Sequence, residues 1–254
     1  MMVGGYQPLT DSQWQGIAWL LPVQRQRRLC LRRVVEALRY ICCTGCQWRC
    51  LPAAFPKWTA VYYYFRRWQQ DGTLQRLNQA LNQADRQAHG QATTPDVLCL
   101  DSQSVQLAPR IAEHRGTDGG KCINGRRRQL LVDDGRVWAG RSRAANQHDS
   151  RGAAPLLLER RHWGPRLTPM VTDSAYRGHF AEGLRARGLR HEEVSGRSPT
   201  AQGVVPMGPR WVVERTFAWL NFFRRLVMDY EYTPESHAAW MLWANVSLCL
   251  NRLQ

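Results

Sequence analysis

The sequence predicts an α/β fold in which a mixed sheet flanked by helices follows an all-α N-terminal segment. Residues 10–89 repeat apolar side chains at helical spacing, whereas residues 97–173 contain short apolar runs bounded by turn-forming residues. Strands that pair first as a hairpin and then alternate with helices build a mixed sheet. We therefore expect a helical domain over residues 1–90 and an α/β domain over residues 95–254, joined by the polar stretch near 87–95.

The N-terminal segment is expected to hold several amphipathic helices. Thr10 is a candidate N-cap for a first helix that stops at Pro22, and residues 29–43 repeat apolar side chains every three or four positions. After the turn-forming stretch TGCQWRCLPAAFP, Thr59 can cap a helix over residues 59–69.

The helix over residues 59–69 is both basic and aromatic. Such a helix, placed after a helix and a turn, suits the recognition element of a helix-turn-helix, in which Arg66 and Arg67 contact bases or phosphates. A purely structural interpretation is that Val61 and Phe65 pack the helix into a small bundle. The two interpretations are compatible because they use different faces of the helix.

The second half of the chain opens with strand patterns. VLCLDSQSV predicts a short apolar strand, and RRRQLLVDDGRVWAGRS predicts two strands joined by a hairpin with Asp133 and Asp134 at its turn. DSRGAAPLLLERRHW predicts a helix with leucines on one side, for which His148 is a loop or capping residue. LTPMVTD predicts a further strand, and a helix, a short strand and two long helices follow it.

The composition points to a polyanionic partner. Lys and Arg number 35 against 20 Asp and Glu, which gives a formal net charge of +15. Residues 1–95 hold 12 of the basic and 4 of the acidic side chains, so both halves can contact phosphate, and nucleic acid is the leading candidate. The sequence has no apolar stretch of about 18 residues and no signal peptide at its start, so we expect a cytoplasmic protein without a membrane partner.

Eight cysteines include the cluster Cys42, Cys43, Cys46 and Cys50. No second CxxC pair or His pair follows this cluster at zinc-finger spacing. We therefore expect these residues to be reduced thiols that pack the helical segment rather than ligands of zinc.

Three acidic residues lie where regular elements can bring them together. Asp101 is in VLCLDSQS, Asp173 in PMVTDSAYRG and Glu214 in PRWVVERTFAWL. Hard divalent cations prefer carboxylate oxygens, and a two-metal site about 3.5–4 Å across needs two or three acids from separate elements.

Each acid also has a structural interpretation. Asp101 can be a turn residue at a strand end, Asp173 a helix cap and Glu214 a solvated helix residue. The apolar surroundings of Glu214 favour a buried carboxylate, which must be paired or bind metal. Arg210, one turn earlier on the same face, is its expected structural partner.

Four stretches together carry a family resemblance: TGCQWRCLPAAFPKWTAVYYYFRRWQQDG, DSQSV, TDSAYRG and RWVVERTFAWLNFFRRL. In this order they resemble the N-terminal helical domain, the first and second catalytic strands and the C-terminal acidic helix of DDE transposases of the insertion-sequence-five type. That type lies within the broader insertion-sequence-four-like superfamily. The resemblance runs over nearly the whole chain.

The resemblance implies an RNase H-like catalytic domain in which Asp101, Asp173 and Glu214 are the catalytic residues and hold two Mg²⁺ ions. It implies that Mn²⁺ can substitute for Mg²⁺. The implied activity is binding to the ends of an insertion element, followed by metal-dependent cleavage of a DNA strand and transfer of that strand to a target.

The resemblance also places Arg210 in a signature Tyr-x2-Arg-x3-Glu-x6-Lys around the third acid. This chain has Met207 and Asn221 where the Tyr and the Lys would fall. The departures weaken an assignment of DNA contacts to those two positions, although Arg215 and neighbouring arginines can supply charge nearby.

The implied partners are the terminal repeats of the element and the target DNA, bound by a homo-oligomer. Basic residues of the helix over 59–69, of the stretch GTDGGKCINGRRR and of the acidic helix are the candidates for contact with this DNA. The complete set is Arg66, Arg67, Lys121, Arg126, Arg127, Arg128, Arg210, Arg215, Arg224 and Arg225.

Two alternatives remain open from the sequence. One is a metal-dependent nuclease on the same fold, which cuts DNA but does not join it. The other is a catalytically inactive DNA-binding remnant of such an enzyme. The presence of all three acids argues against loss of catalysis.

Binding to duplex DNA should depend steeply on salt. Each phosphate neutralised by the basic side chains releases about 0.9 counterions, so several contacts together produce a sharp loss of affinity between 50 and about 200 mM salt. Electrophoretic mobility shifts over a salt series measure this slope. An affinity that stays flat over the series would separate the basic excess from DNA binding.

Overall fold

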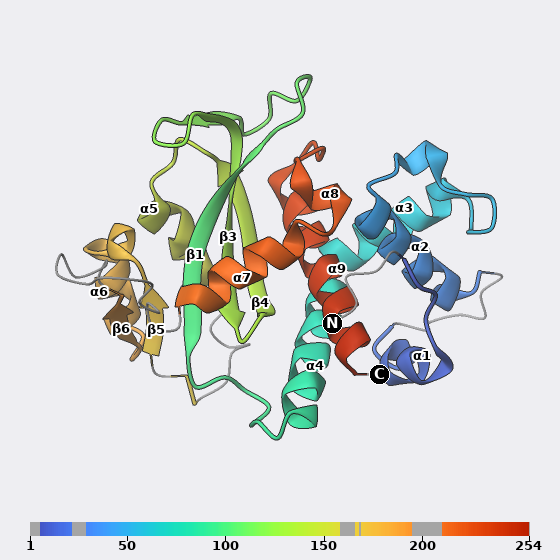
Figure 1. Cartoon of the computed structure of the whole chain (residues 1–254), viewed down its shortest axis with the longest axis horizontal. Helices are drawn as coiled ribbons and strands as arrows, with labels where there is room; N and C mark the ends of the chain where they lie inside the picture. The colour runs from blue at the N-terminus through green and yellow to red at the C-terminus, as the bar shows by residue number, and fades with distance from the viewer. Residues whose placement is uncertain (1–5, 22–28, 158–165, 168, 195–209, 254) are drawn as a thin grey trace, which may run out of the picture.

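The structure, a computed structural model, describes residues 6–21, 29–157, 166–167, 169–194 and 210–253. A six-stranded mixed sheet lies on one side of the molecule and a group of N-terminal helices on the other, with the C-terminal helix α9 (Pro234–Arg252) running between them (Figure 1). This order confirms the predicted fold class, an all-α segment followed by a mixed sheet flanked by helices.

The N-terminal helices are α1 (Asp11–Ala18), α2 (Leu31–Thr44), α3 (Trp58–Gln70) and α4 (Thr73–Ala88), with a 3₁₀ turn at Trp48–Cys50. The predicted cap of the first helix is confirmed, because the Thr10 hydroxyl accepts from the Gln13 N–H and the Gln13 side chain accepts from the Thr10 N–H.

The predicted cap at Thr59 is wrong. Helix α3 already begins at Trp58, and the carbonyl of Lys57 accepts the N–H groups of Ala60 and Val61. Thr59 therefore lies inside the first turn, beyond the position from which a side chain caps a helix.

The sheet has strands in the order β4 (Arg136–Ala144), β3 (Ile123–Asp133), β1 (Leu98–Gln106), β5 (Pro169–Thr172) and β6 (Arg190–Glu193), and β2 (Gly116–Asp118) pairs with the start of β3. The β4–β3–β1 part is antiparallel, whereas β5 and β6 run parallel to β1. This arrangement agrees with the RNase H-like fold. The predicted hairpin between β3 and β4 is confirmed, and both turn residues, Asp134 and Gly135, have positive φ.

Helices cover both faces of the sheet. Leu98 and Leu100 of β1 point towards the face that holds α5 (Asp149–Ala153) and α6 (His179–Arg185), where they share a core with Phe180. Cys99 points to the opposite face and shares a core with α7 (Arg210–Leu220), near α8 (Arg224–Val227) and α9. The alternation of side chains along a strand thus decides which residues of β1 face α7.

The C-terminal helix joins the helical part to the sheet. Helix α9 packs against α2, α4 and β4, and one continuous core runs from Leu9 to Leu250. Helix α4 ends at Ala88, where the sequence predicts the polar connection, but the domain boundary itself stays a prediction. None of the described helices combines the length and apolar character needed to span a bilayer.

A cluster of buried amides secures this junction. Asn245 of α9 donates to the side-chain oxygens of Asn78 and Asn82 of α4, at 2.7 and 2.8 Å. Both α4 residues donate to the backbone carbonyl of Val137, and the Val137 N–H donates to Asn245. These amides thus satisfy the backbone N–H and carbonyl of Val137, where β4 meets the two helices.

A buried ion pair joins β3 to the segment before α9. Arg126 is fully buried and donates to the Asp229 carboxylate at 3.0 Å and to the carbonyls of Glu231 and Tyr232 at 2.7 Å. His237 lies 2.9 Å from the same carboxylate. Burial opposes the charged form of Asp229, but the charge of His237 and its hydrogen bond outweigh it, so the pKa of Asp229 is lowered.

The substitution Asp229→Asn should destabilise the fold by about 3–5 kcal/mol, because it leaves the Arg126 charge buried and uncompensated. Urea unfolding followed by circular dichroism measures this change. Asp96→Asn is the matched control, since the Asp96–Arg166 pair is exposed, and it should leave the free energy of unfolding nearly unchanged. Equal effects of the two substitutions would contradict the assigned role of the buried pair.

Candidate active site

The strand register brings two of the predicted acids to the same level. Strands β1 and β5 pair in parallel, with Leu98 beside Met170 and Cys99 beside Val171. The same offset of 72 residues places Asp101 level with Asp173, which follows the last residue of β5. Adjacent parallel strands lie about 4.8 Å apart, so the two carboxylates start from neighbouring positions.

Glu214 belongs to the helix that covers this part of the sheet. Helix α7 packs against β1 and β3 and crosses β1 in Figure 1. Its Val213 and Phe217 share a core with Cys99, and by strand alternation Asp101 points to the same face as Cys99. The third acid therefore comes from an element that lies over the strand carrying the first.

The expectation that Glu214 is buried is wrong. Helix α7 buries Val213, Phe217 and Leu220 against the sheet, while Glu214 is exposed on the neighbouring side of the helix. The apolar residues around Glu214 in the sequence thus do not bury it, because only one face of the helix packs against the sheet. The side chain of Arg210, the expected partner of Glu214, lies outside the described residues.

Backbone N–H groups orient the two strand-borne carboxylates. The Ser102 N–H donates to Asp101 at 2.7 Å, and the Ala175 N–H donates to Asp173 at 3.0 Å. Asp173 thereby caps the 3₁₀ turn Ser174–Tyr176, as the structural interpretation of this residue expected. Capping uses one oxygen contact of the carboxylate and is compatible with a ligand role.

Tyr176 is a buried tyrosine that responds to the charges of the acids. It is fully buried, and its hydroxyl accepts from the Gln129 side chain at 3.2 Å. Burial raises the pKa of Tyr176, and the negative charges of Asp149, Asp101 and Asp173 raise it further. Three carboxylates therefore act on one buried phenol, which stays protonated at neutral pH.

The set of donors fits Mg²⁺ by its chemistry, since carboxylate oxygens are the ligands that hard divalent cations prefer. Within the described residues, no three Asp, Glu, His or Cys side chains form a ready-made group around one ion. The assignment of Asp101, Asp173 and Glu214 as metal ligands therefore remains a proposal.

A fourth acid, Asp149, is the residue that the sequence interpretation missed. Its carboxylate accepts from the Ser102 hydroxyl at 2.7 Å, from Arg143 at 2.7 Å and from Arg127 at 3.0 Å. The sequence treats it as an ordinary acid in the first turn of a helix, where negative charge is common. His148 caps this helix, as predicted. In the sequence, only the alternation of side chains along the predicted strand could have indicated that Arg127 faces away from Arg126 and Arg128 and needs a carboxylate as its partner.

Asp118 is a further member of this hydrogen-bond network. It accepts from the Ser104 hydroxyl and from Arg127, each at 2.5 Å. Burial opposes its charged form, but these hydrogen bonds and the Arg127 charge outweigh it and lower the pKa of Asp118 to about 2. Asp118 thus stays ionised, and Arg127 is occupied by the two carboxylates that flank it, Asp118 and Asp149.

The structure corrects the prediction of DNA contact for four arginines, because their side chains are buried or paired within the protein. Arg126 and Arg128 are fully buried, and Arg128 donates to Gln103, to Asn221 and to the carbonyl of Leu226. Arg127 is held by Asp118 and Asp149, and Arg225 is buried against Glu231. These residues do not lie in a basic loop, because β3 sends its consecutive arginines into both faces of the sheet and α8 turns Arg225 inwards.

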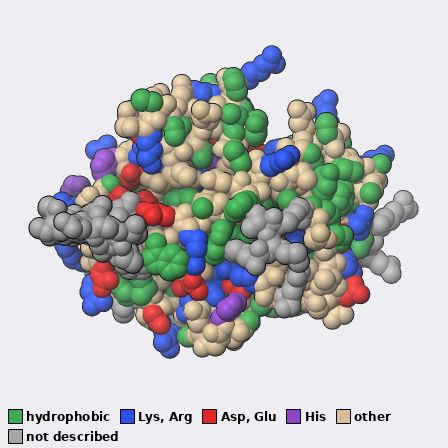
Figure 2. Space-filling model, in the orientation of Figure 1, with side chains coloured by type: hydrophobic (Ala, Val, Ile, Leu, Met, Phe, Trp, Pro, Cys, Tyr) green, Lys and Arg blue, Asp and Glu red, His purple; other side chains and the backbone are tan. Residues whose placement is uncertain are grey.

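The other basic residues remain accessible, apart from Arg210, whose side chain is not described. Lys121 and Arg224 are exposed, and Arg66 and Arg67 are partly exposed. Arg215 lies over the rings of Trp211 and Trp219, at 4.3 and 4.7 Å, and donates to Asp134. On the face in Figure 2, Lys and Arg side chains are scattered among apolar and polar ones.

Exposed aromatic residues near α8 were also missed by the sequence interpretation. Phe222, Tyr230 and Tyr232 are more than half exposed, and Arg224, close to Phe222 in sequence, is exposed as well. Aromatic rings beside arginine are suited to stacking on nucleic-acid bases.

The cysteine cluster begins in the core. Cys42 is fully buried on α2 and its thiol donates to the carbonyl of Trp240, as a packing role predicts. Burial raises the pKa of the Cys42 and Cys43 thiols. Cys46 is half-buried and Cys50 is exposed, and zinc binding by the cluster stays untested.

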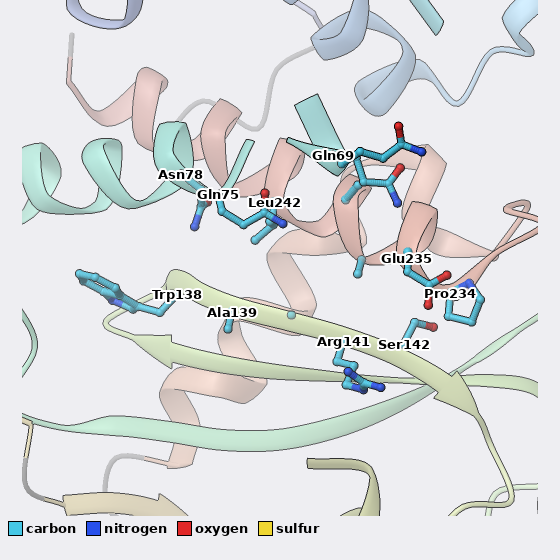
Figure 3. Close-up of a pocket in the computed structure, with 14 residues that line it drawn as sticks. Gln69, Gln75, Asn78, Trp138, Ala139, Arg141, Ser142, Pro234, Glu235 and Leu242 are labelled. Carbon is cyan, nitrogen blue, oxygen red and sulfur yellow. The ribbon is translucent and has the colours of Figure 1, made fainter. Parts of the chain in front are cut away.

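A pocket of about 320 Å³ lies away from the acids, between α3, α4, β4 and α9 (Figure 3). Its lining is mixed and includes the polar residues Gln69, Gln75, Asn78 and Arg141 beside the apolar Trp138 and Leu242. None of Asp101, Asp173 and Glu214 lines it, so this pocket is separate from the candidate active site.

Comparisons with known proteins identify the family of this chain. A family described as "Transposase DDE domain" matches residues 92–250, and one described as "Putative transposase of IS4/5 family" matches residues 9–78. A protein of Burkholderia cepacia named "Putative transposase for insertion sequence element IS402" is 31% identical over 140 residues, which cover 51% of this chain. The matched stretch spans 65% of that relative's length.

Proposed function

Since this chain belongs to the DDE transposase family of the insertion-sequence-four type, we propose that it binds the ends of an insertion element and catalyses metal-dependent DNA cleavage and strand transfer. The observation that carries the proposal is the parallel register that brings Asp101 level with Asp173. Helix α7, which carries Glu214, packs on the same strand.

Asp101, Asp173 and Glu214 are proposed to hold two Mg²⁺ ions, with Mn²⁺ as a substitute. A bound pair of such ions supplies an activated water and compensates the charge of the leaving 3′ oxygen. Three carboxylates do not fully neutralise two divalent ions, so attraction for phosphate oxygens is retained. Ser102 and Ala175 orient two of these carboxylates through their backbone N–H groups.

Cleavage and strand transfer can use the same residues. In the first reaction, water attacks the phosphodiester at the element boundary and the 3′ oxygen leaves. In the second, the freed 3′-hydroxyl attacks a phosphodiester of the target and the target's 3′ oxygen leaves. Both reactions displace an oxygen at phosphorus, so no side-chain nucleophile is required.

Accessible basic residues near α7 are proposed to position the DNA. Arg215 follows Glu214, and its guanidinium is held between two tryptophan rings. Lys121 lies on an exposed loop and Arg224 on the exposed side of α8. Arg210 is proposed as a further contact on the family resemblance alone.

The substitutions Asp101→Asn, Asp173→Asn and Glu214→Gln should each lower cleavage by at least about 100-fold, because each removes an oxygen that holds a metal ion. Binding to DNA should change little, since the basic surface is intact. Cleavage of a duplex bearing the element end, in Mg²⁺, and mobility shifts measure the two properties. Asp96→Asn, an exposed acid outside the site, is the control.

The products of this assay also separate the alternatives. Nicks without joined products indicate a nuclease, and binding without nicks indicates an inactive remnant. Substantial Mg²⁺-dependent cleavage by any one of the three variants would remove that residue from the site.

Helix α3 is proposed to recognise the element ends. It buries Val61, Phe65 and Trp68, while Tyr62 and Tyr63 are exposed next to the partly exposed arginines. The two predicted faces of this helix, one packing and one accessible, are therefore both present. Arg67 donates to the Tyr63 hydroxyl, which keeps the two side chains together.

Replacing Arg66 and Arg67 by alanine should weaken binding to the terminal repeats more than binding to random DNA. A bidentate arginine–guanine contact contributes about 1–3 kcal/mol of discrimination. Competition mobility shifts with the two DNAs measure the ratio of affinities. A double substitution of Arg185, the last residue of α6, and Arg187, two residues further on, removes equal charge and should lower both affinities alike. An unchanged ratio for the α3 variant would leave these arginines as phosphate contacts only.

A further inference from the structure

Asp149 lies behind the strand that carries Asp101. Asp101 points to the α7 face, whereas the next residue, Ser102, points to the α5 face and donates to Asp149 at 2.7 Å. The Ser102 N–H meanwhile donates to Asp101 at 2.7 Å. One residue thus binds Asp149 with its side chain and Asp101 with its backbone.

Asp149 also reaches the turn that carries Asp173. Gln129 of β3 donates to the Asp149 backbone carbonyl at 2.9 Å and to the Tyr176 hydroxyl at 3.2 Å. Tyr176 ends the 3₁₀ turn that Asp173 caps. The segment at Asp149 is therefore linked to both strand-borne acids by short chains of hydrogen bonds.

The charge of Asp149 is already balanced. Arg143 donates to one oxygen at 2.7 Å and Arg127 to the other at 3.0 Å, and the carboxylate is largely buried. An acid that serves two guanidinium groups and one hydroxyl has its lone pairs in use. This bonding suits Asp149 to holding its neighbours in place.

We propose that Asp149 is a positioning residue of the metal site, which holds Ser102, Arg127 of β3 and Arg143 of β4 so that Asp101 and Asp173 keep a ligating arrangement. The inference rests on the proposed function, because it concerns the same metal-binding acids. Groups that orient metal ligands from behind typically change metal affinity or activity by about 10–100-fold when they are lost.

Binding of Mn²⁺ to the full-length protein, titrated by the electron paramagnetic resonance signal of the free ion, tests the proposal without relying on activity. Asp149→Asn should weaken Mn²⁺ binding by about 10-fold or more. Ser102→Ala keeps the charge and removes one hydrogen bond, so it should give a smaller shift in the same direction. The Mg²⁺ concentration for half-maximal cleavage should move in parallel.

Asp133→Asn is the matched control. Asp133 is the last residue of β3, is similarly buried and pairs with two arginines, Arg86 and Arg136. Its loss should lower the thermal midpoint about as much as that of Asp149 and leave Mn²⁺ binding at the wild-type value. Weakened Mn²⁺ binding by both aspartate variants would reduce the role of Asp149 to general stability.

Two other outcomes overturn the proposal, and a third removes the metal site on which it rests. Wild-type affinity in Asp149→Asn, with Asp101→Asn strongly weakened, would remove Asp149 while leaving the metal site in place. A shift in Asp149→Asn with none in Ser102→Ala would mean that Asp149 acts by charge alone and not by positioning. If wild-type protein and Asp101→Asn bound Mn²⁺ equally, the proposed metal site itself would fail.

Discussion

Three consecutive arginines of β3 hold the layers of this protein to its sheet. Because side chains alternate along a strand, Arg126 and Arg128 point to one face and Arg127 to the other. Arg126 binds Asp229 before α9, Arg128 binds Asn221 just after α7 and the Leu226 carbonyl in α8, and Arg127 binds the β2 and α5 segments. Buried guanidinium groups need all these acceptors, so the surrounding segments are fixed by the requirement to satisfy them.

The same requirement shapes the candidate active site. Five acidic side chains come from the segments around it, and close carboxylates repel one another unless cations intervene. Arg127 and Arg143 neutralise Asp118 and Asp149, which are the two acids beneath the strand. In the proposed function the metal ions bind Asp101, Asp173 and Glu214, whereas Asp118 and Asp149 serve the buried arginines.

Much of the fold could be predicted because local patterns and long-range contacts agree. The Thr10 cap, the hairpin turn at Asp134 and the strand carrying Asp101 all follow from neighbouring residues. The roles of Arg126 and Arg128 could not be predicted in this way, because their partners lie about a hundred positions away in sequence. The role of Asp149 could not be predicted for a similar reason, because its arginine partners are identified only when β3 and β4 are paired. Glu214 lies in the predicted helix, but it is exposed and not buried as the sequence predicted, since an apolar composition does not say which face a helix buries.

The departure from the family signature at Asn221 is explained by Arg128. Asn221 directly follows α7 and accepts from Arg128 at 3.0 Å, while the same guanidinium donates to Gln103, two residues beyond Asp101 on β1. Burial lowers the pKa of Arg128 to about 10, so it remains a cation at neutral pH. A lysine at position 221 would place a second cation beside it and could not accept its hydrogen bond. In this chain Arg128 of β3 therefore bonds both to Asn221, next to α7, and to Gln103 of β1. These hydrogen bonds fix the helix of Glu214 over the strand of Asp101.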